Sequence, residues 1–207
     1  EALLKFKKCI DLSPSGAWYY HSYGSVLNNN LGRTTEALFY FKKAAELESE
    51  NLIFQYEIGN VYKKLKDNTN ALTHFDRAIS ILEKKNQQKQ YPWIYLETGY
   101  FVMDTLKQPL KSISYFERGA KAGMLLCYTY LGEIYQSQNM PEKGFYYHKI
   151  NVDESVKRNE LPNWSSMINV IDYLYYNKHY NNAYSYCQIA LKQNYDKEKK
   201  YSVLERK

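Results

Sequence analysis

Small and aromatic residues recur along the chain in a fixed order. In residues 58–78, Gly59 is followed by an aromatic residue after three positions, by Ala71 after twelve, by Phe75 after sixteen and by Ala78 after nineteen. Spacings of three and four residues place apolar side chains on one face of a helix. Polar residues fill the positions between them, so the segment predicts two amphipathic helices joined by a short turn.

The same order of residues recurs around four other positions. The spacing is unchanged around Gly132 and Ile171, whereas one extra residue separates the two halves around Gly24 and Gly99. At the start of the chain, residues 2–14 match only the second half of the unit. Several matches in phase are hard to obtain by chance, so the chain is predicted to be a helical repeat array.

The phase of the repeats predicts an all-α fold made of helix pairs. Pro92, Pro109, Pro141 and Pro162 stand at or near expected helix starts, where the missing N–H of proline costs nothing. A single pair cannot bury its apolar face, so neighbouring pairs are expected to stack. The first helices are expected at Ala17–Asn30, Leu52–Leu65, Pro92–Leu106, Leu125–Ser137 and Asn163–Asn177, and the second helices at Thr34–Glu48, Asn68–Lys85, Pro109–Ala122, Pro141–Arg158 and Tyr180–Gln193.

The repeated pattern resembles that of the tetratricopeptide repeat family, whose signature is W-x2-L-G-x2-Y, then A-x3-F and a later Pro. The resemblance covers essentially the whole chain, although Gly144 stands at an alanine position and the final proline is kept only at Pro14. Residues 114–123 also resemble Sel1-type repeats, which share the helix-hairpin unit. The resemblance implies a right-handed α-solenoid of antiparallel helix pairs. Its expected parts are a partial repeat at 1–14, repeats at about 17–50, 52–85, 92–123, 125–161 and 164–194, and a capping or truncated helix at 195–207.

The composition and the charge of the chain indicate a folded domain and argue against nucleic-acid binding and membrane spans. Hydrophobic residues make up 44% of the 207-residue chain and charged residues 24%, which is typical of a folded domain. The net charge is +6, but acids and bases are interleaved, so no nucleic-acid partner is expected. No apolar run approaches the length of a membrane span. The three cysteines are far apart, which mildly favours the cytoplasm, and the chain begins within a helical pattern, so we expect a fragment of a longer protein.

No grouping of residues points to catalysis. The sequence has no phosphate-binding glycine loop, zinc-protease motif or nucleophile elbow. Its four histidines are not paired with one another at metal-ligand spacing. Of these, His148 falls at the aromatic packing position of its repeat and is expected to be a packed ring. We therefore expect no enzymatic activity, no cofactor and no metal, with a helical-repeat transferase as the least favoured interpretation.

The family resemblance implies where a partner would bind. In this family the first helices line a concave groove, and the residues found there suit an extended peptide or a partner helix. The expected groove residues are His21, Ser25, Asn28, Tyr56, Asn60, Lys63, Leu96, Tyr100, Met103, Thr129, Glu133, Gln136 and Asp172, with Ile168 and Tyr175 beside them.

Two further expectations concern the kind of partner. The subclass that clamps chaperone C-termini needs basic residues beside an asparagine such as Asn60, and Ser25, Leu96 and Tyr100 replace them, so no such clamp is predicted. The tryptophans can serve repeat packing or ligand stacking. The leading hypothesis is a protein–protein interaction scaffold, and the alternative is a peptide-responsive regulatory domain of a larger signalling protein.

Overall fold

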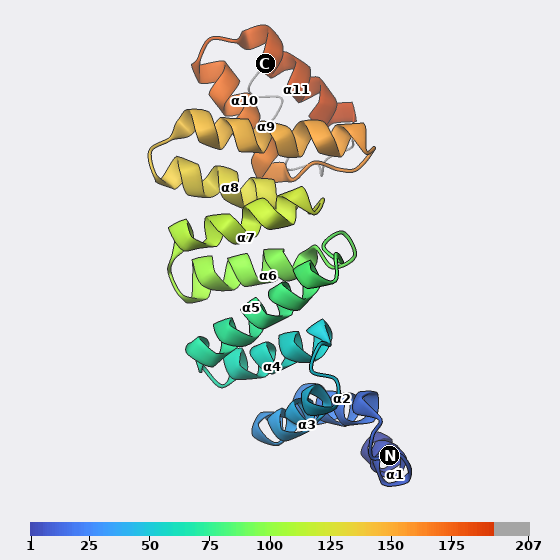
Figure 1. Ribbon diagram of the computed structural model, residues 1–207. Helices are drawn as coiled ribbons and strands as arrows, with labels where there is room; N and C mark the ends of the chain where they lie inside the picture. Colours follow the sequence, from blue (N-terminus) through green and yellow to red (C-terminus); the bar gives the residue numbers. More distant parts are fainter. Residues whose placement is uncertain (193–207) are drawn as a thin grey trace. The chain divides into compact units, whose positions relative to one another are not determined.

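The computed structural model describes residues 1–192, and this part of the chain is helical without any β-strand (Figure 1). Its elements are α1 (Ala2–Leu12), α2 (Ala17–Ser25), η1 (Val26–Asn30), α3 (Thr34–Leu47), α4 (Leu52–Lys64), α5 (Asn68–Lys84), α6 (Trp93–Tyr100), η2 (Phe101–Thr105), α7 (Pro109–Lys121), α8 (Leu126–Ser137), α9 (Pro141–Lys157), α10 (Trp164–Tyr176) and α11 (Tyr180–Lys192). The predicted all-α class is confirmed, and the predicted helix bounds differ from these by no more than a residue at either end.

The chain forms two compact units, Glu1–Leu106 and Lys107–Lys207. In the first unit, α2 packs on α3 and α4 packs on α5; in the second, α8 packs on α9 and α10 on α11 (Figure 1). The predicted repeat at 92–123 spans the division between the units, so a single array over residues 1–207 stays a prediction. The expected capping helix at 195–207 lies outside the described residues.

Local sequence signals fix the helix ends. The side chains of Asn51, Asp67 and Asn163 accept hydrogen bonds from the backbone N–H groups at the starts of α4, α5 and α10. Such N-caps satisfy donors that have no partner within the helix. Pro109 and Pro141 open α7 and α9. The turns after the first helices each contain a left-handed residue, namely Gly32, Lys66, Lys107, Asn139 and Lys178. This conformation closes a helix C-terminus.

Two of the first helices end in a π-helical turn, η1 and η2. They belong to the two repeats whose halves are separated by one extra residue, the repeats around Gly24 and Gly99. A π turn accommodates one inserted residue within an otherwise regular helix. The slip in the sequence pattern is therefore absorbed inside the first helix and not in the turn that follows it.

Small residues and rings pack against each other between the two helices of a pair. A Cβ atom built on Gly59 would lie 2.6 Å from the Phe75 ring, and one on Gly132 would lie 2.6 Å from the His148 ring. Only glycine admits these rings, since anything larger would push the helices apart. The aromatic at this position is fully or almost fully buried in both units. The repeated glycine–aromatic pattern is thus the packing signature of the hairpins.

Candidate partner-binding surface

The first helices of successive pairs lie side by side within each unit. In the first unit, Lys64 Nζ donates to Asn28 Oδ1 at 3.1 Å and joins α4 to η1. The rings of Tyr56 and Trp93 meet edge to face at 4.8 Å and join α4 to α6. In the second unit, α8 contacts α10 directly. We call the predicted groove positions on these helices the first-helix face, and we describe it separately for each unit.

Most predicted residues of the first unit are partly accessible. The half-buried ones are His21, Ser25, Asn60, Lys63, Leu96 and Met103, and Tyr100 is 43% exposed. His21 is wedged among the rings of Trp18, Phe41 and Phe54 at 5.1–5.5 Å. Burial lowers the pKa of the His21 imidazole. Its ring is therefore a neutral, rigid part of the surface.

Two predicted residues of the first unit do not line an open surface. Tyr56 is only 8% exposed, since its ring packs against Phe75 at 5.3 Å as well as against Trp93. Burial also raises the pKa of its hydroxyl. Asn28 is buried, and its amide oxygen is occupied by Lys64. Both side chains hold neighbouring helices together, and their contact with a partner stays a prediction.

In the second unit, four polar side chains on α8 and α10 are connected to one another. Ser165 Oγ donates to Glu133 Oε1 at 3.2 Å, and Gln136 Nε2 donates to Asn169 Oδ1 at 2.9 Å. Asn169 Nδ2 in turn donates to the backbone oxygen of Ser165 at 2.8 Å. We call these four residues the polar ledge. All are half-buried, and burial raises the pKa of the Glu133 carboxyl. The ledge therefore presents a preordered carboxylate and amides at the surface.

Thr129 was predicted to lie on the same surface, but it is buried. Its hydroxyl lies 2.9 Å from Ser166 Oγ, and that oxygen lies 3.0 Å from His148 Nδ1. These three side chains form a hydrogen-bonded chain inside the second unit, so Thr129 does not line an open surface, and its contact with a partner stays a prediction. Asp172 and Ile168 are half-buried and Tyr175 is exposed. Sequence reasoning missed Ser165 and Asn169, although their polarity one turn apart on a first helix was a usable signal.

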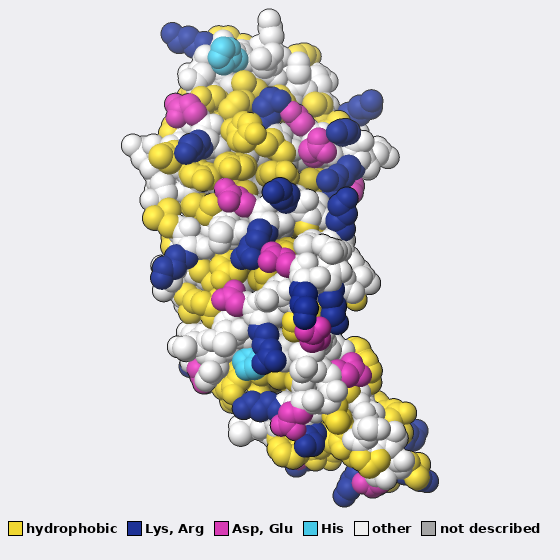
Figure 2. Space-filling model, viewed as in Figure 1, with side chains coloured by type: hydrophobic (Ala, Val, Ile, Leu, Met, Phe, Trp, Pro, Cys, Tyr) yellow, Lys and Arg dark blue, Asp and Glu magenta, His cyan; other side chains and the backbone are white. Residues whose placement is uncertain are grey.

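We also searched the described residues for metal sites, membrane-spanning helices and reactive cysteines. Residues 1–192 contain no group of three potential ligands that could hold a metal ion, and no helix among them is long and apolar enough to cross a membrane. Cys127 is buried, which raises the pKa of its thiol to about 12. On the face shown in Figure 2, basic and acidic side chains are interspersed, and hydrophobic side chains gather over α8 and α9.

Comparisons with known proteins support the helical repeat. A model of the tetratricopeptide repeat matches residues 19–51 and 54–84. Over 83 residues, 39% of this chain, the sequence is 35% identical to anaphase-promoting complex subunit 3 of Schizosaccharomyces pombe, of which the chain spans only 12%.

Solved structures show the same fold at low sequence identity. YrrB, described as a TPR protein with an unusual peptide-binding site, matches with a TM-score of 0.60 and 17% identity over 97% of both chains. The pilF protein of Pseudomonas aeruginosa matches with a TM-score of 0.64 and 14% identity over 99% of this chain and 88% of its own. The Sel1-like character of residues 114–123 stays a prediction.

Proposed function

We propose that this chain is an interaction scaffold of the tetratricopeptide repeat type, whose first-helix face binds an extended peptide or a helix of a partner protein. The observation that carries the proposal is the polar ledge of the second unit. Its amides and its carboxylate are held in place by one another and by neighbouring helices. Groups fixed before binding lose little conformational entropy when they bond a partner backbone.

The first unit offers complementary chemistry. Tyr100 exposes 43% of its surface on α6, one turn after the half-buried Leu96, and Asn60 is half-buried on α4. An exposed ring one turn from an aliphatic side chain, together with an amide on a neighbouring first helix, suits a peptide that presents apolar side chains and backbone groups. The peptide-binding site named for YrrB is consistent with this use of the fold. No contact described above favours the alternative, a peptide-responsive regulatory domain, and we propose no enzymatic activity.

The proposal is tested by selecting peptides from a display library on the whole chain and measuring their affinities for variants. The double variant Gln136→Ala/Asn169→Ala removes the bonded amides of the ledge, whereas Gln188→Ala removes an exposed amide on a second helix. We expect affinity to fall by about tenfold or more in the double variant and to stay unchanged in the control. Equal affinity for both variants, with far-ultraviolet circular dichroism showing intact helices, would refute binding at the ledge.

A further inference from the structure

The carboxylate of the polar ledge has no cation beside it. Glu133 Oε1 accepts from Ser165 Oγ at 3.2 Å, and Glu133 forms no ion pair with any residue in the described range 1–192. Burial raises the pKa of this carboxyl and the hydrogen bond from Ser165 lowers it, with no contribution from a base among those residues. A half-buried carboxylate without a counterion has lost part of its hydration, and a bound cation would offset that loss.

Acidic and basic residues are segregated between the first and second helices of the second unit. The first helices α8 and α10 contain Glu133 and Asp172 and no Lys, Arg or His. In the described part of this unit, the lysines and arginines lie on α7, α9 and α11 and in the turns. Among them, Lys143 at the start of α9 lies over the Tyr135 ring at 5.1 Å and forms no ion pair with Glu133. The first-helix face of the second unit is therefore acidic.

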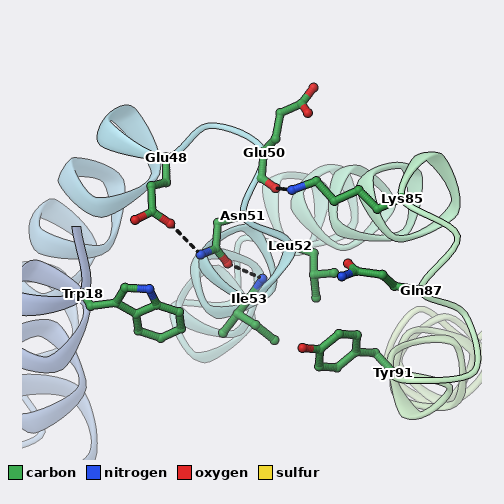
Figure 3. A pocket seen from close by; sticks show the side chains of 9 residues that line it. All are labelled: Trp18, Glu48, Glu50, Asn51, Leu52, Ile53, Lys85, Gln87 and Tyr91. Carbon is green, nitrogen blue, oxygen red and sulfur yellow. Dashed lines mark hydrogen bonds between the residues drawn. The ribbon is translucent and has the colours of Figure 1, made fainter. Parts of the chain in front are cut away.

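A cleft of about 440 Å³ in the first unit shows the opposite situation, in which the charges balance (Figure 3). Glu48 and Glu50 both line it. Glu50 forms an ion pair with Lys84, and Lys85 Nζ donates to the backbone oxygen of Glu50 at 2.6 Å. Two lysines thus compensate two glutamates, so this cleft selects no charge. The uncompensated carboxylate of the polar ledge says more about the chemistry of a partner.

Gln136 is fixed in the ledge from two sides. Its Nε2 atom donates to Asn169 Oδ1 at 2.9 Å, and the Oε1 atom of the same amide has no hydrogen-bond partner among residues 1–192. On the other side its stem lies against Gly144 of α9, where an added Cβ atom would collide with Gln136 Cγ. The glycine that replaces the alanine of the repeat at this position therefore makes room for the Gln136 side chain. Its free amide oxygen is held in place before any partner binds.

The open oxygens of Glu133 and Gln136 both reach the surface. Among residues 1–192, the fully buried side-chain nitrogen and oxygen atoms without a hydrogen bond are ring atoms of His21 and His148. Glu133 Oε2 and Gln136 Oε1 are not among these atoms, so both keep accessible surface. Because the two residues are three positions apart on α8, their side chains lie on one face of the helix. One donor group with several N–H bonds can use both oxygens.

We propose that the polar ledge binds a lysine side chain of the partner, whose ammonium group bonds to Glu133 Oε2 and Gln136 Oε1. An ammonium is a compact charge with three donors, which can point to acceptors on two different side chains. A guanidinium is less suitable, because it pairs best with both oxygens of one carboxylate, and Glu133 Oε1 already accepts from Ser165. The inference rests on the proposed function, since it names the chemistry of the partner that the ledge selects.

The test compares three tripeptides that differ in one side chain. Acetyl-glycyl-lysyl-glycine amide and its norleucine and arginine counterparts are titrated into the whole chain, and the side-chain amide resonances of Gln136 are followed by NMR. These resonances are assigned with the Gln136→Ala variant. Norleucine keeps the aliphatic stem without the charge, and the acetyl group removes the N-terminal amine as a source of charge. We expect the lysine peptide to shift the resonances saturably and to bind about tenfold more tightly than the norleucine peptide, with the arginine peptide between them.

Two substitutions locate the effect. Glu133→Gln keeps the shape of the side chain and an acceptor for Ser165, and it is expected to reduce the affinity for the lysine peptide to that for the norleucine peptide. Glu117→Gln, which removes an exposed carboxylate from the second helix α7, is expected to change nothing. Equal affinities for the lysine and norleucine peptides, tighter binding of the arginine peptide, or an unchanged lysine affinity in Glu133→Gln would overturn the lysine site.

Failure of the lysine site and failure of the proposed function give different results. If the lysine site is overturned, loss of the library-selected peptides in the Gln136→Ala/Asn169→Ala variant would still support the proposed function. Normal binding of those peptides by the double variant, beside a preference for lysine that depends on Glu133, would refute the proposed function and leave the lysine site in place.

Discussion

Lowering the pH is expected to weaken the second unit through one buried imidazole. The His148 side chain has no accessible surface, and its Nε2 atom has no hydrogen-bond partner among residues 1–192. Its Nδ1 atom lies 3.0 Å from Ser166 Oγ. Burial lowers the pKa of His148 from 6.5 to about 4, because the charged ring would be desolvated. The folded unit therefore keeps this ring neutral at a pH where the unfolded chain protonates it.

The size and sign of the effect follow from linkage. Above pH 6.5 the imidazole is neutral in both states, and the full stability is present. As the pH falls from 6.5 towards 4, the unfolded chain binds a proton that the folded unit does not, so the free energy of unfolding decreases. The pKa of His148 is 6.5 in the unfolded chain and about 4 in the folded unit. At about 1.4 kcal/mol per pH unit, this difference lowers the free energy of unfolding by about 3 kcal/mol. This is a large fraction of the stability of a small domain.

The assay compares wild type with His148→Phe in urea titrations at several pH values. Phenylalanine stands at the matching position in Phe41, Phe75 and Phe116, so the ring itself is compatible with the hairpin. Replacing Trp18 and Trp93 by Phe in both proteins leaves Trp164 as the fluorescent reporter of the second unit. Other titrating groups cancel in the difference between the two proteins.

We expect wild type to lose about 3 kcal/mol more than the variant between neutral pH and pH 4. The exposed His179, replaced by Phe, serves as the control and is expected to leave the pH profile of wild type unchanged. Parallel stability curves for wild type and His148→Phe would refute the reasoning, because they would mean that the folded unit takes up the proton as readily as the unfolded chain.

Other substitutions test the packing and the surface. Gly59→Leu is expected to destabilise the first unit by about 3 kcal/mol in thermal unfolding, since a Cβ there already crowds the Phe75 ring, and a variant as stable as wild type would contradict the packing. Asp67→Ala is expected to cost about 1 kcal/mol in urea unfolding by removing the N-cap of α5, and an unchanged midpoint would count against the cap. Thr129→Val is expected to cost about 1 kcal/mol without changing the affinity for a peptide bound to the ledge. Tyr100→Ala is expected to weaken peptide binding while its stability changes by less than about 0.5 kcal/mol, and the opposite outcome would place this ring in the core.

The helices could be predicted because the residue types at a few repeated positions determine how the two helices of a pair pack. In a hairpin such as α4–α5 a glycine faces a ring, as Gly59 faces Phe75, and this close contact fixes the spacing between the two helices. Caps such as Asp67 and helix-opening prolines then set the ends. These interactions are local in sequence, so the amino-acid pattern alone is sufficient to identify them.

The surface was harder to predict because burial at its edge depends on residues of the next helix pair. Tyr56 is covered by Trp93, which lies 37 positions later, and Thr129 is covered because Ser166 bonds to it from α10. A position facing the groove in one repeat therefore becomes a core position when its neighbour carries a large ring or a matching hydroxyl. A motif transferred from a family contains no information about such neighbours.

The burial of Asn28 has a different cause, which lies in its own helix. The expected groove position of Asn28, four residues after Gly24, assumes a helix that is regular throughout. The π turn starts at Val26, so the inserted residue rotates every later position by about 100° relative to a regular helix. His21 precedes the turn and keeps the orientation of its counterparts, whereas Asn28 is turned toward α4, where Lys64 bonds to it. Met103 lies in the equivalent turn η2 but is half-buried, whereas Asn28 is buried. The register of groove positions transferred from a regular repeat is therefore shifted after the inserted residue.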